Sequence, residues 1–387
     1  MKNNTKKPSA LAALTGAALT LPAIAQLAHA TDMPTKTEVG YRYSDYQEKD
    51  LDQDQVLVGT TERYDINTHQ FRLLAPVGDK TSLKVDAMYE TMTGASAMSV
   101  IENPQGDSQL IMTGASIKEE RTDVAAELRR YDDRGSKAIT LGFSTEDDYE
   151  AINGSLDMEI DDVDGVTTWS GGIGFSYDEL EPIQEEGINR VTSEDRTFIN
   201  GYVARAKVHS SVWQTQLGLY LGWYDGYLDD PYRIRDVRPD SRQQLAFTAS
   251  SRYFLVAMKA ALHVDYRFYN DDWGVQSHTL EFSWHQSLSN AFRVSPRIRY
   301  YSQSQADFYV EADSGSRQGE QSSDFRLSPY GAIAYGLGLG YHQPQYSLTF
   351  YAEQYTSDAD YALKSVSKAS PFLVDYTLLT VGMDYRF

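Results

Sequence analysis

Residues 213–223 read WQTQLGLYLGW, and the alternation in this stretch decides the fold class. One face is apolar and has an indole at each end: Trp213, Thr215, Leu217, Leu219, Leu221 and Trp223. Ten steps of about 3.3 Å along a strand tilted by about 40° place the two indoles about 25 Å apart on a barrel axis. This height matches the apolar band of an outer-membrane β-barrel between its two aromatic girdles.

Three later stretches repeat the alternation, at residues 258–268, 280–285 and 292–300. A β-sandwich strand also alternates, because its apolar face packs in a dry interior and its polar face meets water. Aromatic residues recur at the ends of these stretches, however, and the chain begins with an export signal. Together these features favour an apolar outer face and a polar lumen.

The first thirty residues are organised as a secretory signal peptide. Basic residues precede an apolar run of small residues at 10–25, and the Ala-His-Ala motif at 28–30 matches a cleavage pattern. A membrane anchor is the alternative, but the apolar run is short for a spanning helix. We therefore expect a signal peptide at 1–30 and a single barrel domain at 31–387, exported to the outer membrane.

The composition excludes several classes of protein. The 387 residues include no cysteine, which excludes a disulfide framework and thiolate metal ligands. The formal net charge of -20 argues against nucleic-acid binding. No run of eighteen apolar residues follows the signal, so no spanning helix is predicted. An exported chain with 28 tyrosines is then a large soluble β-protein or an outer-membrane barrel.

The alternating stretches number about sixteen, at roughly 22 residues for each strand and its connection, a density similar to that of porins. The predicted strands begin near Lys36, Tyr64, Thr81, Thr122, Ser136, Tyr149, Val166, Arg196, Ser211, Arg242, Met258, Val275, Ala291, Phe325, Tyr346 and Phe372. No repeat with a fixed motif accompanies them, which disfavours a propeller or a solenoid.

The connections between these stretches alternate in length. If the first strand begins in the periplasm, every second connection is short, as at 76–80 and 342–345. Most of the others are long, as at 94–121 and 304–324. Bacterial barrels have short periplasmic turns and long extracellular loops. The sequence therefore predicts an all-β, transmembrane antiparallel barrel of about 16 strands with this topology.

The chain ends TVGMDYRF at 380–387. A soluble domain usually ends in a frayed polar tail, whereas this ending alternates up to an aromatic carboxyl terminus. Its spacing resembles the last-strand pattern that the barrel assembly machinery reads. We expect Thr380, Gly382, Tyr385 and Phe387 to form that signal, with the two aromatic residues in the periplasmic girdle.

Six longer stretches carry a family resemblance: MTGAS at 92–96, TGASIKEERTDV at 113–124, STEDDY at 144–149, DDPYRIRDVRPDSR at 229–242, YRFYNDDWGVQSHTLEFSW at 266–284 and YYSQSQADFYV at 300–310. They resemble the bacterial family catalogued as domain of unknown function 3570. The resemblance implies an outer-membrane β-barrel but no particular activity. Through genome context it also implies a small lipoprotein, a thioredoxin-like protein and a flavin transferase as neighbours, which suggests an envelope redox system.

The sequence Thr-Gly-Ala-Ser occurs twice, at 93–96 and 113–116. It resembles the motif at which flavin transferases attach FMN through a phosphoester, although Glu90 and Leu110 stand where that motif has Asp. The predicted topology also places this loop outside the periplasm. The alternative is that glycine and small residues shape two strand ends. Covalent FMN on Ser96, or on Ser116, is therefore the cofactor hypothesis, with Ser96 the better acceptor.

Charged residues fall on the polar phase of neighbouring strands. If this phase faces inward, the lumen is lined by Arg205, Lys207, Lys259, His263, Asp265, Arg267, Glu281, His285, Arg293, Arg297 and Arg299. Basic groups along a pore favour anions or hold an acidic plug. The alternative is an internal ion-pair network, in which Asp265 and Glu281 neutralise some of the arginines.

Metal binding and catalysis have little support in the sequence. The acidic loops lack the spacing of an EF-hand calcium loop, so we expect solvated loops among lipopolysaccharide and no metal. His263 and His285 have Ser283 and Asp265 nearby, which are the residue types of a hydrolase triad. Spacing alone cannot show that these side chains touch, and no other catalytic motif is present.

The sequence thus predicts a non-enzymatic conduit or assembly scaffold of the cell envelope, linked by the family resemblance to a flavin-dependent redox system. A general or anion-preferring diffusion porin and an outer-membrane hydrolase are the alternatives. The expected partners are outer-membrane lipid and lipopolysaccharide, the barrel assembly machinery, and the small periplasmic lipoprotein and thioredoxin-like protein of the resemblance. Nucleic acid is not expected.

Overall fold

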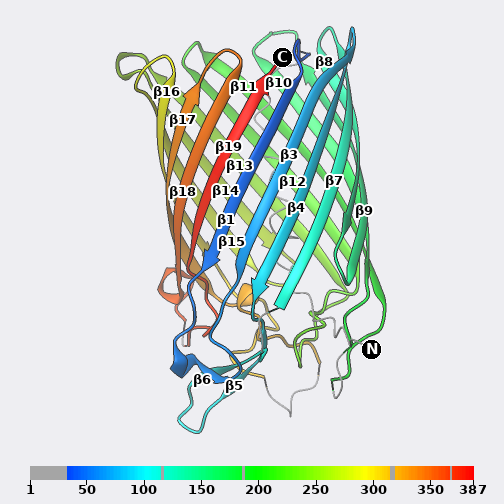
Figure 1. Ribbon diagram of the computed structural model, residues 1–387, viewed down its shortest axis with the longest axis vertical. Helices are drawn as coiled ribbons and strands as arrows, with labels where there is room; N and C mark the ends of the chain where they lie inside the picture. Colours follow the sequence, from blue (N-terminus) through cyan, green and yellow to red (C-terminus); the bar gives the residue numbers. More distant parts are fainter. Residues whose placement is uncertain (1–32, 115–116, 185–187, 314–318, 367) are drawn as a thin grey trace, which may run out of the picture.

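The computed structural model of the chain describes residues 33–114, 117–184, 188–313, 319–366 and 368–387. The predicted signal peptide and Ser116 lie outside the described residues. Within them the structure is a closed antiparallel barrel of sixteen strands, in which β1 pairs with β19 (Figure 1). A separate three-stranded sheet has the order β2-β6-β5. The predicted fold class is therefore confirmed.

The barrel strands are β1 (Glu38–Glu48), β3 (Asp65–Gly78), β4 (Thr81–Gly94), β7 (Ile117–Asp132), β8 (Gly135–Thr145), β9 (Tyr149–Asp161), β10 (Thr167–Leu180), β11 (Glu194–Ser210), β12 (Trp213–Gly226), β13 (Ser241–Leu255), β14 (Ala260–Asp271), β15 (Gln276–Ser287), β16 (Phe292–Gln303), β17 (Tyr330–His342), β18 (Tyr346–Asp358) and β19 (Tyr376–Arg386). The small sheet contains β2 (Val56–Val58), β5 (Ala97–Glu102) and β6 (Ser108–Met112). The predicted strand starts agree closely; the largest difference, five residues, occurs at β7 and at β17. At β17 the predicted start, Phe325, opens a 3-10 turn that precedes the strand.

The two ends of the barrel differ in the length of their connections. We call the end with short connections the turn end and the opposite end the loop end. At the turn end, two residues join β3 to β4 and two join β7 to β8, whereas at the loop end long connections gather beyond the wall (Figure 1). The predicted alternation of short and long connections is therefore confirmed.

The outer face of the barrel is apolar. On β12, Leu221 and Trp223 are 57% and 56% exposed, whereas the intervening Tyr220 and Gln216 are 8% and 6% exposed. An exposed apolar band on a closed barrel is stable in hydrocarbon and would be unfavourable in water. The alternation at residues 213–223 thus separates an outer lipid-facing surface from a polar lumen.

The last strand closes the barrel, with Tyr41 of β1 opposite Met383. Val381 and Met383 lie on the outer face. Gly382 faces inward, where an added Cβ would lie 2.6 Å from the Thr349 hydroxyl and 3.1 Å from Cγ of Arg42. Glycine therefore leaves room for the Arg42 side chain at this position. Recognition of the ending by the assembly machinery stays a prediction.

Two groups of loops fold at the loop end. We call residues 49–64 and 95–114 the cap, which contains the small sheet and buries the apolar side chains of Leu51, Val56, Ala95, Ala97, Val100, Leu110 and Met112 together with Phe372. We call residues 227–240, 304–313 and 319–329 the plug. In the plug, Phe308 and Leu327 pack against Tyr220 and Tyr269, which project inward from the barrel wall. The strands of the cap were not predicted from the sequence.

Candidate ligand chamber

A buried ion cluster holds the two loops of the plug together. Asp324, whose side chain is 1% exposed, accepts hydrogen bonds from Arg326 and, at 2.9 Å, from Arg238. Arg326 also lies 3.1 Å from Asp230. Burial by itself raises the pKa of Asp324, but the guanidinium groups of Arg326 and Arg238 outweigh it and lower that pKa below 3.8. The cluster therefore stays ionised and joins residues 229–238 to residues 324–326.

The backbone reinforces this connection between the two loops. Val237 and Gln321 exchange hydrogen bonds of 2.9 and 2.8 Å. Arg233 donates to the Ser323 hydroxyl at 2.7 Å, and the Ile234 amide donates to the Met98 carbonyl of the cap at 2.8 Å. Plug and cap thus form one folded layer across the loop end.

A chamber of about 890 Å³ lies beneath this layer, inside the barrel. Its walls carry many aromatic side chains, among them Tyr149, Tyr220, Tyr224, Tyr269, Trp273 and Tyr301. They also carry more arginines than carboxylates: Arg196, Arg238, Arg242, Arg252, Arg267, Arg297, Arg299 and Arg326, with Asp148, Asp229, Asp230, Asp265 and Glu281. The volume and the mixed aromatic and polar lining are typical of a small-molecule site.

Most of these arginines are held by carboxylates. Arg252 lies 2.7 Å from Asp265, and Arg299 lies 3.2 Å from Glu353. Arg297 contacts both Glu353 and, at 3.6 Å, Glu281. These pairs form the internal network that the sequence left as an alternative to an open basic lining.

Arg267 differs from these arginines. Within the described residues, no carboxylate oxygen lies within 4.0 Å of its guanidinium, and the group makes no hydrogen bond. Its strand neighbours on the inner face are Thr248 and Thr279, and its guanidinium carbon lies 5.2 Å from the ring centre of Tyr269. The chamber therefore contains a cation that no carboxylate of the described residues pairs with.

The predicted lumen residues are divided between the two faces. His263, Asp265, Arg267, Glu281, His285, Arg293, Arg297 and Arg299 share the inner phase of β14, β15 and β16. Lys259 was also assigned to the lumen, and this is wrong, because it lies in the exposed turn between β13 and β14 at the turn end.

Arg205 and Lys207 were assigned to the lumen, and this prediction is wrong. Arg205 stands opposite the outward-facing Leu217, and its guanidinium carbon lies 5.6 Å from the ring centre of Trp169 on the outer face. Lys207 has the same phase on β11. Both belong with Ile199 and Val203 on the lipid side, where long basic side chains can extend toward the interface.

Sequence reasoning also missed Glu353 and Arg252, which complete the lumen network. Glu353 lies on the inward phase of β18, where Ser347 and Tyr351 alternate with Leu348 and Phe350. That alternation was the signal that could have identified it. The plug arginines had no such periodic signal, because their positions depend on loop packing.

The histidines do not form a complete hydrolase triad. The Ser283 hydroxyl lies 3.2 Å from Nε2 of His285, but Nδ1 of His285 is hydrogen-bonded to the Ser295 hydroxyl at 2.9 Å. Asp265, the expected acid, instead accepts hydrogen bonds from Ser250 and Arg252. Among the described residues, therefore, no carboxylate orients this imidazole.

Ser96, the preferred flavin acceptor of the sequence, is 7% exposed in the cap. Its hydroxyl is hydrogen-bonded to the Tyr64 hydroxyl at 2.6 Å, and its amide donates to the Thr113 hydroxyl at 3.2 Å. A transferase would have to reach Ser96 before the cap folds. FMN attachment stays a prediction.

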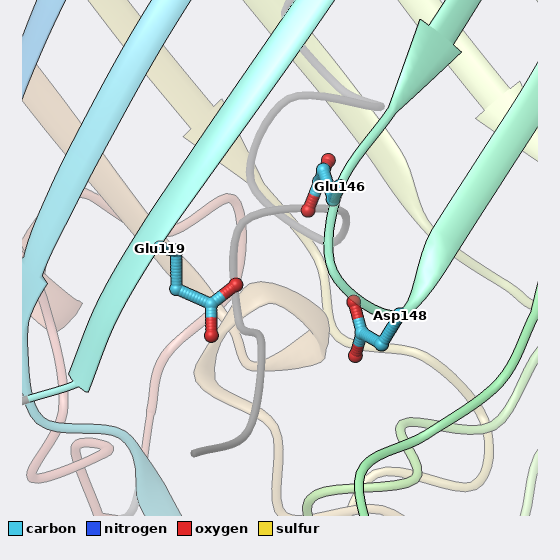
Figure 2. Close-up of side chains that lie close together, drawn as sticks. All are labelled: Glu119, Glu146 and Asp148. Atoms are coloured by element: carbon cyan, nitrogen blue, oxygen red, sulfur yellow. The ribbon is translucent and has the colours of Figure 1, made fainter. Parts of the chain in front are cut away.

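Three carboxylates gather at the loop end on the inner wall: Glu119, Glu146 and Asp148 (Figure 2). One oxygen from each lies within 4.8 Å of the others, and such oxygens suit hard cations. Two neighbours already engage the group, since Nε of Arg121 lies 3.7 Å from Glu146 and the Tyr232 hydroxyl donates to Asp148. The expectation of no metal stays a prediction.

No helix in the described part of the chain is long and apolar enough to cross a membrane. A family model described as a protein of unknown function, DUF3570, matches residues 11–370. The chain belongs to this family. The phrase DDPYRIRDVRPDSR, which carried part of the resemblance, supplies Asp230 and Arg238 of the ion cluster in the plug. No curated protein matches this DUF3570 chain.

Solved outer-membrane barrels share the fold. A bacterial polysaccharide outer membrane secretin aligns with 92% of this chain and 100% of its own, at 9% identity and a TM-score of 0.51. The siderophore receptor PirA of Acinetobacter baumannii aligns over 84% of this chain and 53% of its own, at 10% identity and a TM-score of 0.45. The ferric enterobactin receptor PfeA of Pseudomonas aeruginosa aligns over 91% and 60%, at 11% and 0.45. This DUF3570 chain spans about half to three-fifths of the two receptors, and the likeness is one of fold alone.

Proposed function

We propose that this protein is a non-enzymatic conduit of the bacterial outer membrane, with its loop end outside the cell and a solute chamber beneath its plug. The apolar outer band supports residence in lipid, among the lipopolysaccharide of the outer leaflet. The observation that carries the proposal is the 890 Å³ chamber, which opens between the charged inner wall and the folded loops.

The plug supports a selective or gated passage over a general diffusion pore. Phe308 and Leu327 occupy part of the barrel cross-section, and their packing against Tyr269 is stabilised by the buried charges of Asp324 and Arg238. A general porin keeps a water-filled channel through its lumen. A plugged lumen instead requires loop rearrangement, or a solute small enough to pass beside the plug.

The lumen histidines do not favour the hydrolase alternative, because His285 is hydrogen-bonded to Ser295 where a triad has its acid. A role beside the small lipoprotein and the thioredoxin-like protein of the family resemblance stays a proposal that co-purification from native membranes can test.

Planar-bilayer recordings on the purified protein test the conduit. We expect brief or small openings for the wild type and larger, more frequent openings for Phe308→Ala, which removes a ring from the barrel interior. Asp133→Asn at the turn end, where the side chain is 93% exposed, is the matched control and should behave as the wild type. Electrical silence of all three proteins, with no solute flux into liposomes, would refute the conduit.

A further inference from the structure

Several polar groups of the residues that line the chamber have no hydrogen-bond partner among the described residues, and the Tyr220 hydroxyl is one of them. This hydroxyl is buried, with its residue 8% exposed. A buried hydroxyl without a partner is unfavourable unless a ligand or water completes it. Tyr220 lines the chamber, as does Arg267.

These two groups approach the same part of the wall. Tyr220 on β12 stands opposite Ala246 of β13, and Arg267 on β14 stands opposite Thr248, two residues along the same strand. β12 and β14 both neighbour β13, so their backbones lie about 10 Å apart. The Tyr220 hydroxyl lies beside Gly222, opposite Gln244. A small molecule lying over Ala246 and Thr248 therefore meets the Arg267 guanidinium and must extend toward Gln244 to reach that hydroxyl.

We propose that this part of the chamber is a binding site for an aromatic monocarboxylate, held by Arg267 and Tyr220. The site deepens the proposed conduit function by naming its solute class. A guanidinium presents paired N–H donors that match the two oxygens of a carboxylate. Thr248 and Thr279 flank Arg267 with further hydroxyl groups.

The pairing of the chamber charges favours a monoanion. The chamber arginines other than Arg267 each have a carboxylate partner, as Arg242 has Asp271 at 2.5 Å and Arg196 has Asp178 at 2.8 Å. One uncompensated guanidinium matches one carboxylate. A phosphomonoester carries nearly two negative charges and would leave one of them unmatched in a partly buried site.

The walls select an aromatic body for that anion. Tyr269 lies beside Arg267, and the chamber is also lined by Trp273 and Tyr301. Aromatic rings favour offset or edge contacts with another ring over contact with water or a charged chain. Trp273 is fixed in place, because its indole N–H donates to the Ser241 carbonyl at 2.8 Å and Arg242 lies 4.4 Å from the ring centre.

Calorimetry with benzoate on the purified full chain in detergent tests the site. We expect saturable benzoate binding, with benzamide, the neutral isostere, and phenyl phosphate each bound at least tenfold more weakly. Arg267→Gln should weaken benzoate binding about tenfold or more, since it removes a charge-assisted pair. Tyr220→Phe should weaken it about two- to tenfold, the loss of one neutral hydrogen bond.

Arg293→Gln is the matched control, because Arg293 shares the inner phase but is exposed and lies outside the chamber. It should bind benzoate as the wild type does. If Arg267→Gln fails to fold, Arg267→Lys keeps the charge and loses the fork, and an intermediate affinity is then expected. Equal benzoate affinity in the wild type and the Arg267 variant, no benzoate binding by the wild type, or tighter binding of phenyl phosphate would overturn the proposed site.

The two proposals fail separately. A barrel that conducts ions but binds no benzoate keeps the conduit and removes this site. A barrel that binds benzoate through Arg267 but stays silent in bilayers and passes no solute into liposomes keeps the site and removes the conduit.

Discussion

The turn end and the loop end of this barrel are built by different kinds of contact. At the turn end, short connections join strands that are already neighbours, and the ion pair of Lys80 and Asp133 is solvent-exposed, with Asp133 93% exposed. At the loop end, Arg63 and Glu48 pair at 2.7 Å with each side chain 1% exposed, and Asp324 is buried to the same degree. The turn end only joins the strands of the barrel wall, whereas the loop end has its own apolar cores and its own buried charges.

The difference distinguishes the contacts that any barrel needs from the buried ion pairs that this protein adds at its loop end. A surface pair in high dielectric contributes little, about 0–1 kcal/mol. Breaking a buried pair leaves an uncompensated charge and costs about 3–5 kcal/mol. Buried ionic groups at the loop end therefore define one arrangement of the plug, and the chamber below it depends on that arrangement.

Among the variants that test the difference between the two ends, Asp324→Ala is expected to have the largest effect on stability. The change leaves Arg238 and Arg326 without their shared carboxylate, and we expect the plug to lose about 3–5 kcal/mol of protection against local opening. Hydrogen exchange should show faster exchange at residues 229–238 and 319–327, with the barrel strands unchanged. The paired change at the turn end, Asp133→Ala, should alter neither region by more than about 0.5 kcal/mol. Equal effects at the two ends would remove the distinction.

A smaller effect is expected from Ser96→Ala in the cap. The variant leaves the Tyr64 hydroxyl buried without its partner, which costs about 1–3 kcal/mol of cap stability. Limited proteolysis of residues 95–114 reports the change. Adding Tyr64→Phe removes the second partner and should restore much of the loss, because both polar groups are then gone. A double variant less stable than Ser96→Ala would contradict the hydrogen-bond explanation.

The two ends also differ in how much of their structure the sequence could predict. Strand alternation is local, so Leu217 and Gln216 reveal their faces without any knowledge of distant residues. The register of the wall follows from that period and from the short turns, which is why the strand starts were predicted closely. Arg205 was assigned to the wrong face because the prediction relied on its charge and not on its position in the strand alternation. Val203, which lies on the same face of β11, is apolar.

The loop end lay beyond the same reasoning for a physical reason. Arg238 meets Asp324 across 86 residues, and Val100 of the cap accepts from the Asp313 amide across 213. Such contacts depend on how loops pack and leave no period in the sequence. The unpaired state of Arg267 is equally invisible, since it depends on which carboxylates the other arginines bind. Only residue types, and not their pairing, could be read for the candidate site.

The smallest effect, and the sharpest contrast between the ends, is in pH dependence. At the loop end, burial raises the pKa of Asp229 from 3.8 to about 6, so the folded plug holds this proton more tightly than the open plug does. The plug therefore loses stability as pH rises between about 4 and 6, and it should be more protected at pH 5 than at pH 7. Because Asp229 is partly exposed, we expect a difference of about 1 kcal/mol.

At the turn end the sign is reversed. The Val166 amide and the Thr167 hydroxyl donate to Asp164 and lower its pKa below 3.8, so the turn at 162–166 keeps its stability down to about pH 4 and loses it in stronger acid. Hydrogen exchange, corrected for intrinsic rates, should thus be slower in the plug at pH 5 than at pH 7. Exchange in the turn at 162–166 should be the same at the two pH values. Asp229→Asn should abolish the plug difference, since Asn does not titrate. A pH response that persists in that variant would assign the proton to another group of the loop end.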